Sequence, residues 1–315
     1  MSMKRIAVDA MGGDYAPKAV VEGAVMAASE LPEDYQIVLV GRKDAMLEVL
    51  RPLTYRAGSI EMVEAADVIE MGEHPTRAFG QKPNSSIGVG FKLLKEGTVS
   101  AFCSAGNTGA MMVGSLFTLK TVGNIQRPPI AGYLPLKGGS YGIMLDIGAN
   151  ADCKPEVLNQ FAELGSTYAK YTLNLENPRV GLLNIGEEEE KGNTVAQATY
   201  QLLKNNKKIQ FIGNVEGRDI FNGKADVIVT DGFTGNIIFK MGESMYEHAS
   251  SVGIEDELID RMNYEVVGGS PIIGINGNVI VGHGISSPTA VKNMIRLAQR
   301  QIESQVVEKI KEAFA

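Results

Sequence analysis

The sequence is poor in the residues that build metal centres and disulfide frameworks. Its 315 residues include two cysteines, Cys103 and Cys153, and three histidines, His74, His248 and His283. Two cysteines fit free thiols in a reducing compartment better than a disulfide framework. The histidines are far apart and have no ligand-type spacing with the cysteines. We therefore expect no metal site and no resident cofactor.

Long apolar runs and an excess of positive charge are also missing. No apolar run approaches the roughly 20 residues that a membrane span needs, and the start, MSMKRIAVDA, lacks the apolar segment of a signal peptide. A net charge of -7 argues against a nucleic-acid partner, because phosphate backbones attract clustered Lys and Arg. With 44% hydrophobic and 21% charged residues, the composition is typical of a soluble globular protein. We expect a cytoplasmic protein.

Several catalytic motifs are absent as well. The sequence has no G-x-S-x-G segment, which argues against a serine hydrolase, and no Walker A segment. The segment MGGD at 11–14 does not complete the G-x-G-x-x-G fingerprint of dinucleotide-binding proteins.

What the sequence does have is a regular alternation of short β-rich runs, glycine-rich loops and helical stretches. Strands are predicted over 5–9, 36–40, 60–63, 99–103, 142–147, 180–185, 209–212, 225–230 and 279–281, most of them followed by a helix. Residues 66–83 are expected to be irregular, and one long helix is expected from Pro288, capped by Ser287. This alternation predicts an α/β fold, three-layer α-β-α, with a largely parallel sheet.

Polar and glycine residues gather just after the predicted strands. Ligands bind at that edge of parallel sheets, because the unpaired N–H groups of helix N-termini point there. The loops SAGNTG (104–109) and DGFTGN (231–236) combine glycines with side-chain donors at the start of a helix, and they are the best candidates for an anion cradle. A purely structural role as helix caps is the alternative for each loop.

The acidic run 187–190 precedes Lys191. Such a run is usually a solvated surface, and acids near a helix N-terminus also suit its dipole. Lys191 could reach an anion held by neighbouring loops, and the functional and structural interpretations both stay open. Cys103 closes an apolar strand, which favours a small buried hydrophobe over a nucleophile.

Together the loops resemble a known family. The following segments are similar, in this order, to segments of the phosphate acyltransferase (PlsX) family of bacterial phospholipid synthesis: AVDAMGGD (7–14), NSS (84–86), SAGNTGA (104–110), DIGAN (146–150), KPE (154–156), GLLNIGE (181–187), KGN (191–193), GNVE (213–216), DGFTGN (231–236), GGSP (268–271), HG (283–284) and SS (286–287). The resemblance covers nearly the whole chain and implies one phosphate acyltransferase domain over 1–315.

The resemblance implies an enzyme that converts acyl-[acyl carrier protein] and inorganic phosphate into acyl phosphate. It also implies the architecture of isocitrate dehydrogenases and phosphotransacetylases, a homodimer, and a product that feeds a membrane glycerol-3-phosphate acyltransferase, with a peripheral membrane position left open. The family's helical insertion is shortened here, near 240–266, with helices expected to about 250 and over 255–262, which weakens the inferences about dimer and membrane.

Catalytic roles are predicted for Lys191, Asn107 and Asn236. Substrate-binding roles are predicted for Gly12, Gly13, Asp14, Ser104, Gly106, Thr108, Asn150, Asn214, Glu216, Asp231 and Thr234. Within this set, Ser104, Asn107, Thr108, Lys191 and Asn236 are expected to hold phosphate or the oxyanion. Asp14, Asn150, Asn214, Glu216 and Asp231, with Asp9 outside the set, are expected to shape the loops.

Three rival interpretations remain. A phosphotransacetylase using acyl-CoA would need the same chemistry and differ only in its donor. A dehydrogenase of the isocitrate type would need a nicotinamide cofactor and a divalent metal. A non-catalytic phosphate- or acyl-binding protein would bind acyl phosphate without turnover.

Overall fold

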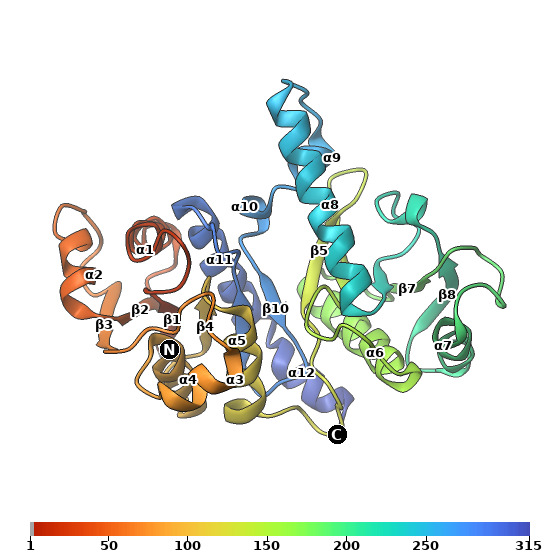
Figure 1. Cartoon of the computed structure of the whole chain (residues 1–315), viewed down its shortest axis with the longest axis horizontal. Helices are drawn as coiled ribbons and strands as arrows, with labels where there is room; N and C mark the ends of the chain where they lie inside the picture. Colours follow the sequence, from red (N-terminus) through yellow and green to blue (C-terminus); the bar gives the residue numbers. More distant parts are fainter. Residues whose placement is uncertain (1–2) are drawn as a thin grey trace. The chain divides into compact units, whose positions relative to one another are not determined.

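The computed structural model describes residues 3–315 as two compact units. Unit 1 combines the chain up to Lys120 with Tyr264–Glu303, and unit 2 combines Thr121–Asn263 with Ser304–Ala315. Each unit has its own mostly parallel sheet flanked by helices (Figure 1). The predicted α/β class is confirmed, but the strands form two sheets where the sequence pattern suggested one.

The sheet of unit 1 has six strands in the order β10-β11-β4-β1-β2-β3. They are β1 (Lys4–Asp9), β2 (Tyr35–Gly41), β3 (Ile60–Glu64), β4 (Ala101–Ser104), β10 (Ser270–Ile272) and β11 (Asn278–Val281). Only the edge strand β10 is antiparallel to its neighbour. In the central strand β1, residues 6–8 (IAV) are fully buried, as expected for a parallel strand covered on both faces.

Helices cover the two faces of this sheet. They are α1 (Lys18–Glu30), α2 (Lys43–Leu50), α3 (Pro75–Gln81), α4 (Ser86–Lys95), α5 (Thr108–Gly114) with a π-helical extension (Ser115–Leu119), α10 (Tyr264–Val267) and α11 (Pro288–Ser304). At Gly23, α1 lies so close to α11 that a β-carbon would be 2.9 Å from Val291 Cγ1. From β1 the strand order runs outward through β2 to β3, and the chain then returns to the other side of β1 to form β4. Because crossovers between parallel strands are right-handed, this return places α4 on the face opposite to α1, and α5 packs against α4.

The sheet of unit 2 has five strands in the order β5-β6-β9-β7-β8. They are β5 (Ala131–Pro135), β6 (Tyr141–Leu145), β7 (Arg179–Leu183), β8 (Gln210–Val215) and β9 (Val227–Val229), with α6 (Pro155–Thr172), α7 (Thr194–Asn205), the 3-10 turn η2 (Gly217–Asp219), α8 (Gly232–Ser251), α9 (Glu257–Asp260) and α12 (Val306–Ala313). Again only the edge strand, β5, is antiparallel.

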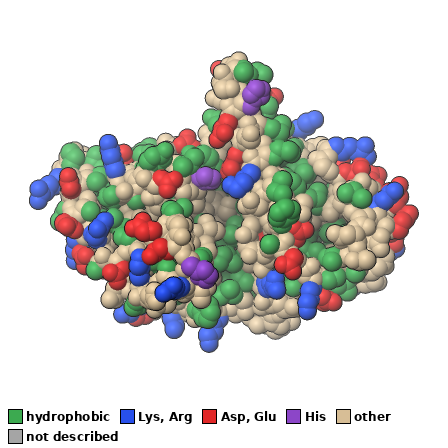
Figure 2. Space-filling view, in the orientation of Figure 1, with side chains coloured by type: hydrophobic (Ala, Val, Ile, Leu, Met, Phe, Trp, Pro, Cys, Tyr) green, Lys and Arg blue, Asp and Glu red, His purple; other side chains and the backbone are tan. Residues whose placement is uncertain are grey.

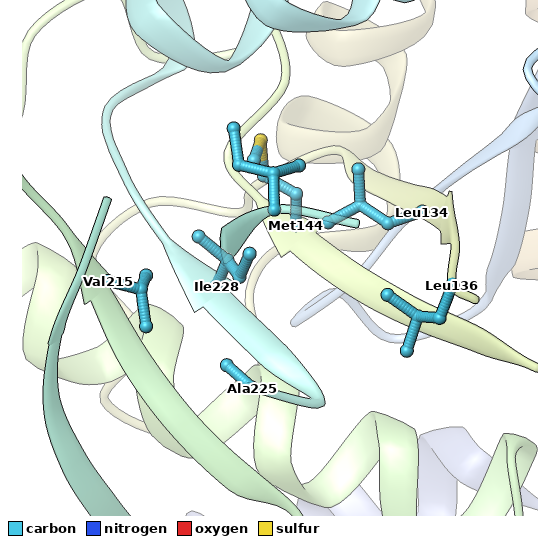
Figure 3. Packing of buried hydrophobic residues seen from close by; sticks show 7 residues of the cluster. Leu134, Leu136, Met144, Val215, Ala225 and Ile228 are labelled. Atoms are coloured by element: carbon cyan, nitrogen blue, oxygen red, sulfur yellow. The ribbon is translucent and has the colours of Figure 1, made fainter. Parts of the chain in front are cut away.

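The alternation of side chains along β6 and β9 shows which helix covers which face. Leu145 and Val227 point toward α6, where they contact Gly165. Met144 and Ile228 point the other way, into a cluster with leucines of β5 and its turn (Figure 3). Ile238 and Phe239 of α8 pack on that cluster, so α6 and α8 lie on opposite faces.

The two sheets share one arrangement. In unit 1, β4 lies between β11 and β1, and its helix α5 lies on the face opposite to α11 and α1. In unit 2, β9 lies between β6 and β7, and its helix α8 lies opposite to α6 and to α7, which packs beside α6. Loops that leave neighbouring strands toward opposite faces mark the position where open parallel sheets bind ligands. The loops after β4 and β9 therefore have that position in their units.

Helix α8 carries an apolar stripe on its surface. Phe233, Ile237, Met241 and Met245 recur every fourth residue and are 44–63% exposed. Apolar side chains are visible along this helix in Figure 2. No helix within residues 3–315 is both long enough and apolar enough to cross a membrane.

Several elements differ from the sequence prediction. The edge strands β5 and β10 and the helix α3 were not expected. Ser287 caps the last long helix as predicted, its Oγ accepting the N–H of Ala290 (3.2 Å). That helix breaks at Gln305, whose left-handed backbone (φ 52°, ψ 34°) separates α11 from α12. In the insertion, α8 extends to Ser251 as expected, the helix expected over 255–262 is shortened to α9, and a further short helix, α10, follows it.

Candidate active site

In unit 1, Asp9 joins the loops after β1 and β4. It is buried, its Oδ1 accepts the N–H of Met11 (3.0 Å), and its Oδ2 accepts the hydroxyl of Ser104 (2.7 Å). Ser104 Oγ in turn accepts the N–H of Gly106 (2.9 Å). Burial raises the pKa of Asp9, against the hydrogen bonds that lower it. The hydroxyl proton of Ser104 is thus committed to Asp9, which favours a loop-fixing role over the predicted contact with phosphate.

Glycines let the two loops approach closely. A β-carbon at Gly12 would lie 2.7 Å from Gly106 N and 2.9 Å from Ser104 Oγ. Gly13 has φ +102°, a conformation that favours glycine, and the next N–H, that of Asp14, donates to Gly284 O (2.8 Å). The predicted residues Gly12, Gly13, Asp14, Ser104 and Gly106 therefore lie together, with the Asp14 side chain exposed.

Asn107 uses its amide within unit 1. Its Oδ1 accepts the N–H of Ala110 (2.9 Å), which makes it the N-cap of α5. Its Nδ2 donates to the backbone carbonyls of residues 70, 71 and 73 at 3.0–3.2 Å. Thr108, the first residue of α5, is exposed. The catalytic role of Asn107 stays a prediction, and the geometry favours a role in fixing the loop.

In unit 2, the buried Asp146 has the corresponding role as a loop anchor. Its Oδ1 accepts the N–H groups of Ile130, Gly148 and Ala149 at 3.0–3.1 Å. Its Oδ2 accepts the N–H (2.6 Å) and Nδ2 (2.9 Å) of Asn150. Burial raises the pKa of Asp146 against these hydrogen bonds. Asp146 was not among the predicted site residues, although it ends an apolar run and begins the DIGAN segment (146–150).

The loop after β9 meets the Asp146 loop. Asp231 is the N-cap of α8: its Oδ1 accepts the N–H of Thr234 (2.7 Å) and its Oδ2 the hydroxyl of Thr234 (3.1 Å). One Nδ2 hydrogen of Asn236 reaches Ile147 O (3.1 Å). The N–H of Gly232 donates to Asn150 O (2.7 Å). These bonds bring the predicted residues Asn150, Asp231, Thr234 and Asn236 together.

Lys191 lies in the loop after β7, the strand beside β9. Its side chain is 45% exposed, with Nζ 3.9 Å from Glu188 Oε2. Asn184, at the end of β7, donates from Nδ2 to Lys191 O (3.1 Å). Asn214, in β8, donates from Nδ2 to Glu188 O (2.8 Å) and has a buried Oδ1 without a hydrogen-bond partner. Asn184 was missed by the sequence analysis, although it follows an apolar strand directly.

The acidic run before Lys191 is paired as well as solvated. Glu187 binds Lys224 (2.6 Å), and Glu189 binds Lys204 (2.6 Å). The run does not act on the dipole of α7 as proposed from the sequence, because the first turn of that helix contains no acidic residue. Its N-cap is Asn193, whose Oδ1 accepts the N–H of Ala196 (2.9 Å).

One acidic cluster in residues 3–315 has the geometry to hold a metal ion: Glu187, Glu216 and Asp219, with ligand atoms within 4.8 Å of one another. Two cations already pair with it, Lys224 with Glu187 and Asp219, and Arg218 with Glu216. The predicted substrate residue Glu216 therefore belongs to an ion-pair cluster. Its backbone N–H also donates to Asp219 Oδ2 (3.1 Å).

Cys103 is fully buried in β4. Burial raises the pKa of its thiol well above the usual range. A thiol in this state is a poor nucleophile, since the thiolate is the reactive form.

Solved structures of two phosphotransacylases share the fold of this chain. A phosphotransacetylase from Streptococcus pyogenes superposes with a TM-score of 0.67 at 17% identity, covering 97% of this chain and 94% of that one. A branched-chain phosphotransacylase from Enterococcus faecalis superposes with a TM-score of 0.65 at 14% identity, covering 95% and 99%. The molecule has the α/β fold of these phosphotransacylases.

The chain belongs to the family of fatty acid synthesis proteins, whose model matches residues 4–258. Two relatives are a phosphate acyltransferase of Syntrophomonas wolfei, 46% identical over 96% of both chains, and one of Dictyoglomus thermophilum, 44% identical over 99% of this chain and 98% of that one. A third, from Salinibacter ruber, is 43% identical over 100% and 98%. The protein is an acyltransferase of fatty acid synthesis, which confirms the family and the enzyme class expected from the sequence.

Proposed function

We propose that this acyltransferase moves a fatty acyl group from acyl-[acyl carrier protein] to inorganic phosphate. The observation that carries the proposal is the near full-length identity of 43–46% to relatives named phosphate acyltransferase. In the reaction, a phosphate oxygen attacks the thioester carbonyl, the carbon–sulfur bond breaks, and the sulfur leaves as the thiol of the carrier protein. The products are acyl phosphate and free carrier protein.

This chemistry needs donors for phosphate and for the oxyanion that forms during attack. Asn236 offers a second Nδ2 hydrogen beyond the one bound to Ile147, and it follows the N-terminus of the 20-residue helix α8. Lys191, on the loop after the neighbouring strand, offers a compact positive charge. We assign Lys191 and Asn236 to phosphate or the oxyanion.

Other side chains fix loop backbone within each unit. Asp9 and Ser104 in unit 1, and Asp146 and Asp231 in unit 2, use their side-chain atoms to fix loop backbone. We assign Asn107 to the same task, because its amide caps α5 and binds three carbonyls. Gly12, Gly13 and Gly106 provide the close approach of backbone that a bound anion also requires.

Further expectations follow from this assignment. The enzyme should act without a cofactor on acyl carrier protein and phosphate in the cytoplasm, as a homodimer. Its product, an activated acyl group, suits a membrane glycerol-3-phosphate acyltransferase as the next enzyme.

Donor preference is the experiment that tests the proposal. The purified protein is incubated with phosphate and either acyl-[acyl carrier protein] or acyl-CoA of the same chain length, and acyl phosphate is trapped with hydroxylamine. We expect much faster turnover with the carrier protein at equal concentration. Equal or faster turnover with acyl-CoA would instead favour the second candidate, a phosphotransacetylase, which the fold likeness supports.

A further inference from the structure

A lysine outside the predicted site joins the Lys191 loop to the next loop of unit 2. Lys224 follows η2 and precedes β9. Its Nζ donates to Glu187 Oε1 (2.6 Å) and to Asp219 Oδ2 (3.1 Å). Glu187 begins the acidic run that leads to Lys191, so one ammonium group connects the segment after β7 with the segment after β8.

The Asp219 end of this connection is fixed. Asp219 is 7% exposed, and its Oδ2 also accepts the N–H of Glu216 (3.1 Å). Its Oδ1 accepts Asn222 Nδ2 (2.9 Å). Hydrogen bonding to Glu187, with a smaller contribution from the hydrogen bond to Asp219, raises the pKa of Lys224, so its ammonium form is favoured. Lys224 is therefore a charged group bound to a turn whose buried carboxylate makes two further hydrogen bonds.

The Glu187 end belongs to an otherwise exposed loop. The Glu187 side chain is 58% exposed, against 32% for Lys224. Two side-chain amides hold the backbone further along, Asn214 at Glu188 O and Asn184 at Lys191 O. Lys224 adds a side-chain anchor at the start of the loop, ahead of both of these backbone contacts.

We infer that Lys224, through Glu187, positions the loop that presents Lys191 to phosphate. This inference rests on the proposed function, in which Lys191 binds phosphate or the oxyanion. Lys224 acts through Glu187 and does not itself hold phosphate, because two carboxylates, Glu187 and Asp219, already pair with its charge. Losing it would let the loop sample arrangements in which Lys191 points elsewhere.

The test compares Lys224→Met with Lys224→Arg and Glu187→Gln. Removing one or two partly exposed ion pairs should lower kcat/KM for phosphate about three- to fivefold. The KM for the acyl donor should not change, and Lys224→Arg should restore most of the loss. Lys208→Met, which breaks an ion pair with Glu163 elsewhere in unit 2, is the matched control and should leave the kinetics unchanged.

Double variants show whether Lys224 acts through the proposed partners. In a Lys191→Met background, Lys224→Met should cause no further loss, and Lys224→Met with Glu187→Gln should be no worse than either alone. Unchanged phosphate kinetics in Lys224→Met and Glu187→Gln, alongside a clear loss in Lys191→Met, would overturn the positioning role and leave the proposed function standing. Unchanged kinetics in Lys191→Met would overturn both the phosphate role of Lys191 and this inference.

Discussion

Gly12 is the residue at which the unit 1 loops have least room. A β-carbon there would collide with Asp9, Ser104 and the N–H of Gly106. We expect Gly12→Ala to cost about 1–3 kcal/mol of unfolding free energy and to abolish most turnover, because the buried Asp9–Ser104 pair must shift. Urea denaturation and the hydroxylamine assay measure the two effects. Gly72→Ala, where a β-carbon meets open space, is the control; equal behaviour of the two variants would contradict this account.

Asp9 gives a pH dependence with a definite sign. Burial raises its folded pKa above the ordinary value of 3.8, so the folded protein binds this proton more tightly than the unfolded chain does. Its contribution to stability is present at low pH and is lost as the pH rises through the folded pKa. Relative to Asp9→Asn, which has no proton to lose, the wild type should become less stable as the pH rises above 3.8, by at most about 1.4 kcal/mol per pH unit.

Urea unfolding of both proteins at a series of pH values measures this difference. A constant gap between the wild type and Asp9→Asn across the series would contradict the assigned pKa direction.

For single residues, the sequence indicated where polar side chains gather but not which atoms form their hydrogen bonds. Ser104 was recognisable as a strand-end donor, yet its hydroxyl binds Asp9, a residue 95 positions away. Asp146 was not recognisable as an anchor, because one of its donors is the N–H of Ile130, just before the unpredicted strand β5. Such long-range partners leave no mark on local periodicity.

Among the elements, α8 carries the feature that bears most directly on assembly. Its stripe of Phe233, Ile237, Met241 and Met245 exposes apolar surface at helical spacing, which is typical of an interface. If a second copy of the chain covers it, Ile237→Glu should shift the protein toward monomer, since a charge would be desolvated in the interface. Light scattering after size exclusion measures the mass. Leu47→Glu, a comparably exposed leucine on α2, should leave it unchanged; the same mass for both variants would argue against this interface.

Elements with strong periodicity or clear end signals were predicted well, and short ones were not. The central strands lie close to their predicted positions, and the helices α1, α6, α7 and α8 follow predicted strands as expected. The edge strand β10 has three residues, too few for a periodic signal, and α3 starts at Pro75 within a segment rich in glycine and charge. The helix break at Gln305 could not be predicted, because no glycine or proline, the usual sequence signals of a helix end, lies there.

For the molecule as a whole, we expect activity to survive exhaustive treatment with EDTA. The acidic cluster of Glu187, Glu216 and Asp219 already pairs with Lys224 and Arg218, which leaves little negative charge for a divalent ion. The measurement is turnover before and after chelation, with added Mg²⁺ as a control that should not stimulate it. A loss of activity that one particular divalent ion restores would show that this cluster, or another group of acids, does bind metal.

The division into two units also sets the order in which the protein can be completed during synthesis. All five strands of the unit 2 sheet lie between residues 131 and 229, whereas β11, the neighbour of β4 in unit 1, spans Asn278–Val281. Until those residues leave the ribosome, β4 has an unpaired edge, which is a template for pairing with other chains. The unit 1 sheet begins first and is completed only after the unit 2 sheet, so a nascent chain that stalls after Asn263 would carry a complete unit 2 sheet and an open, aggregation-prone unit 1 sheet.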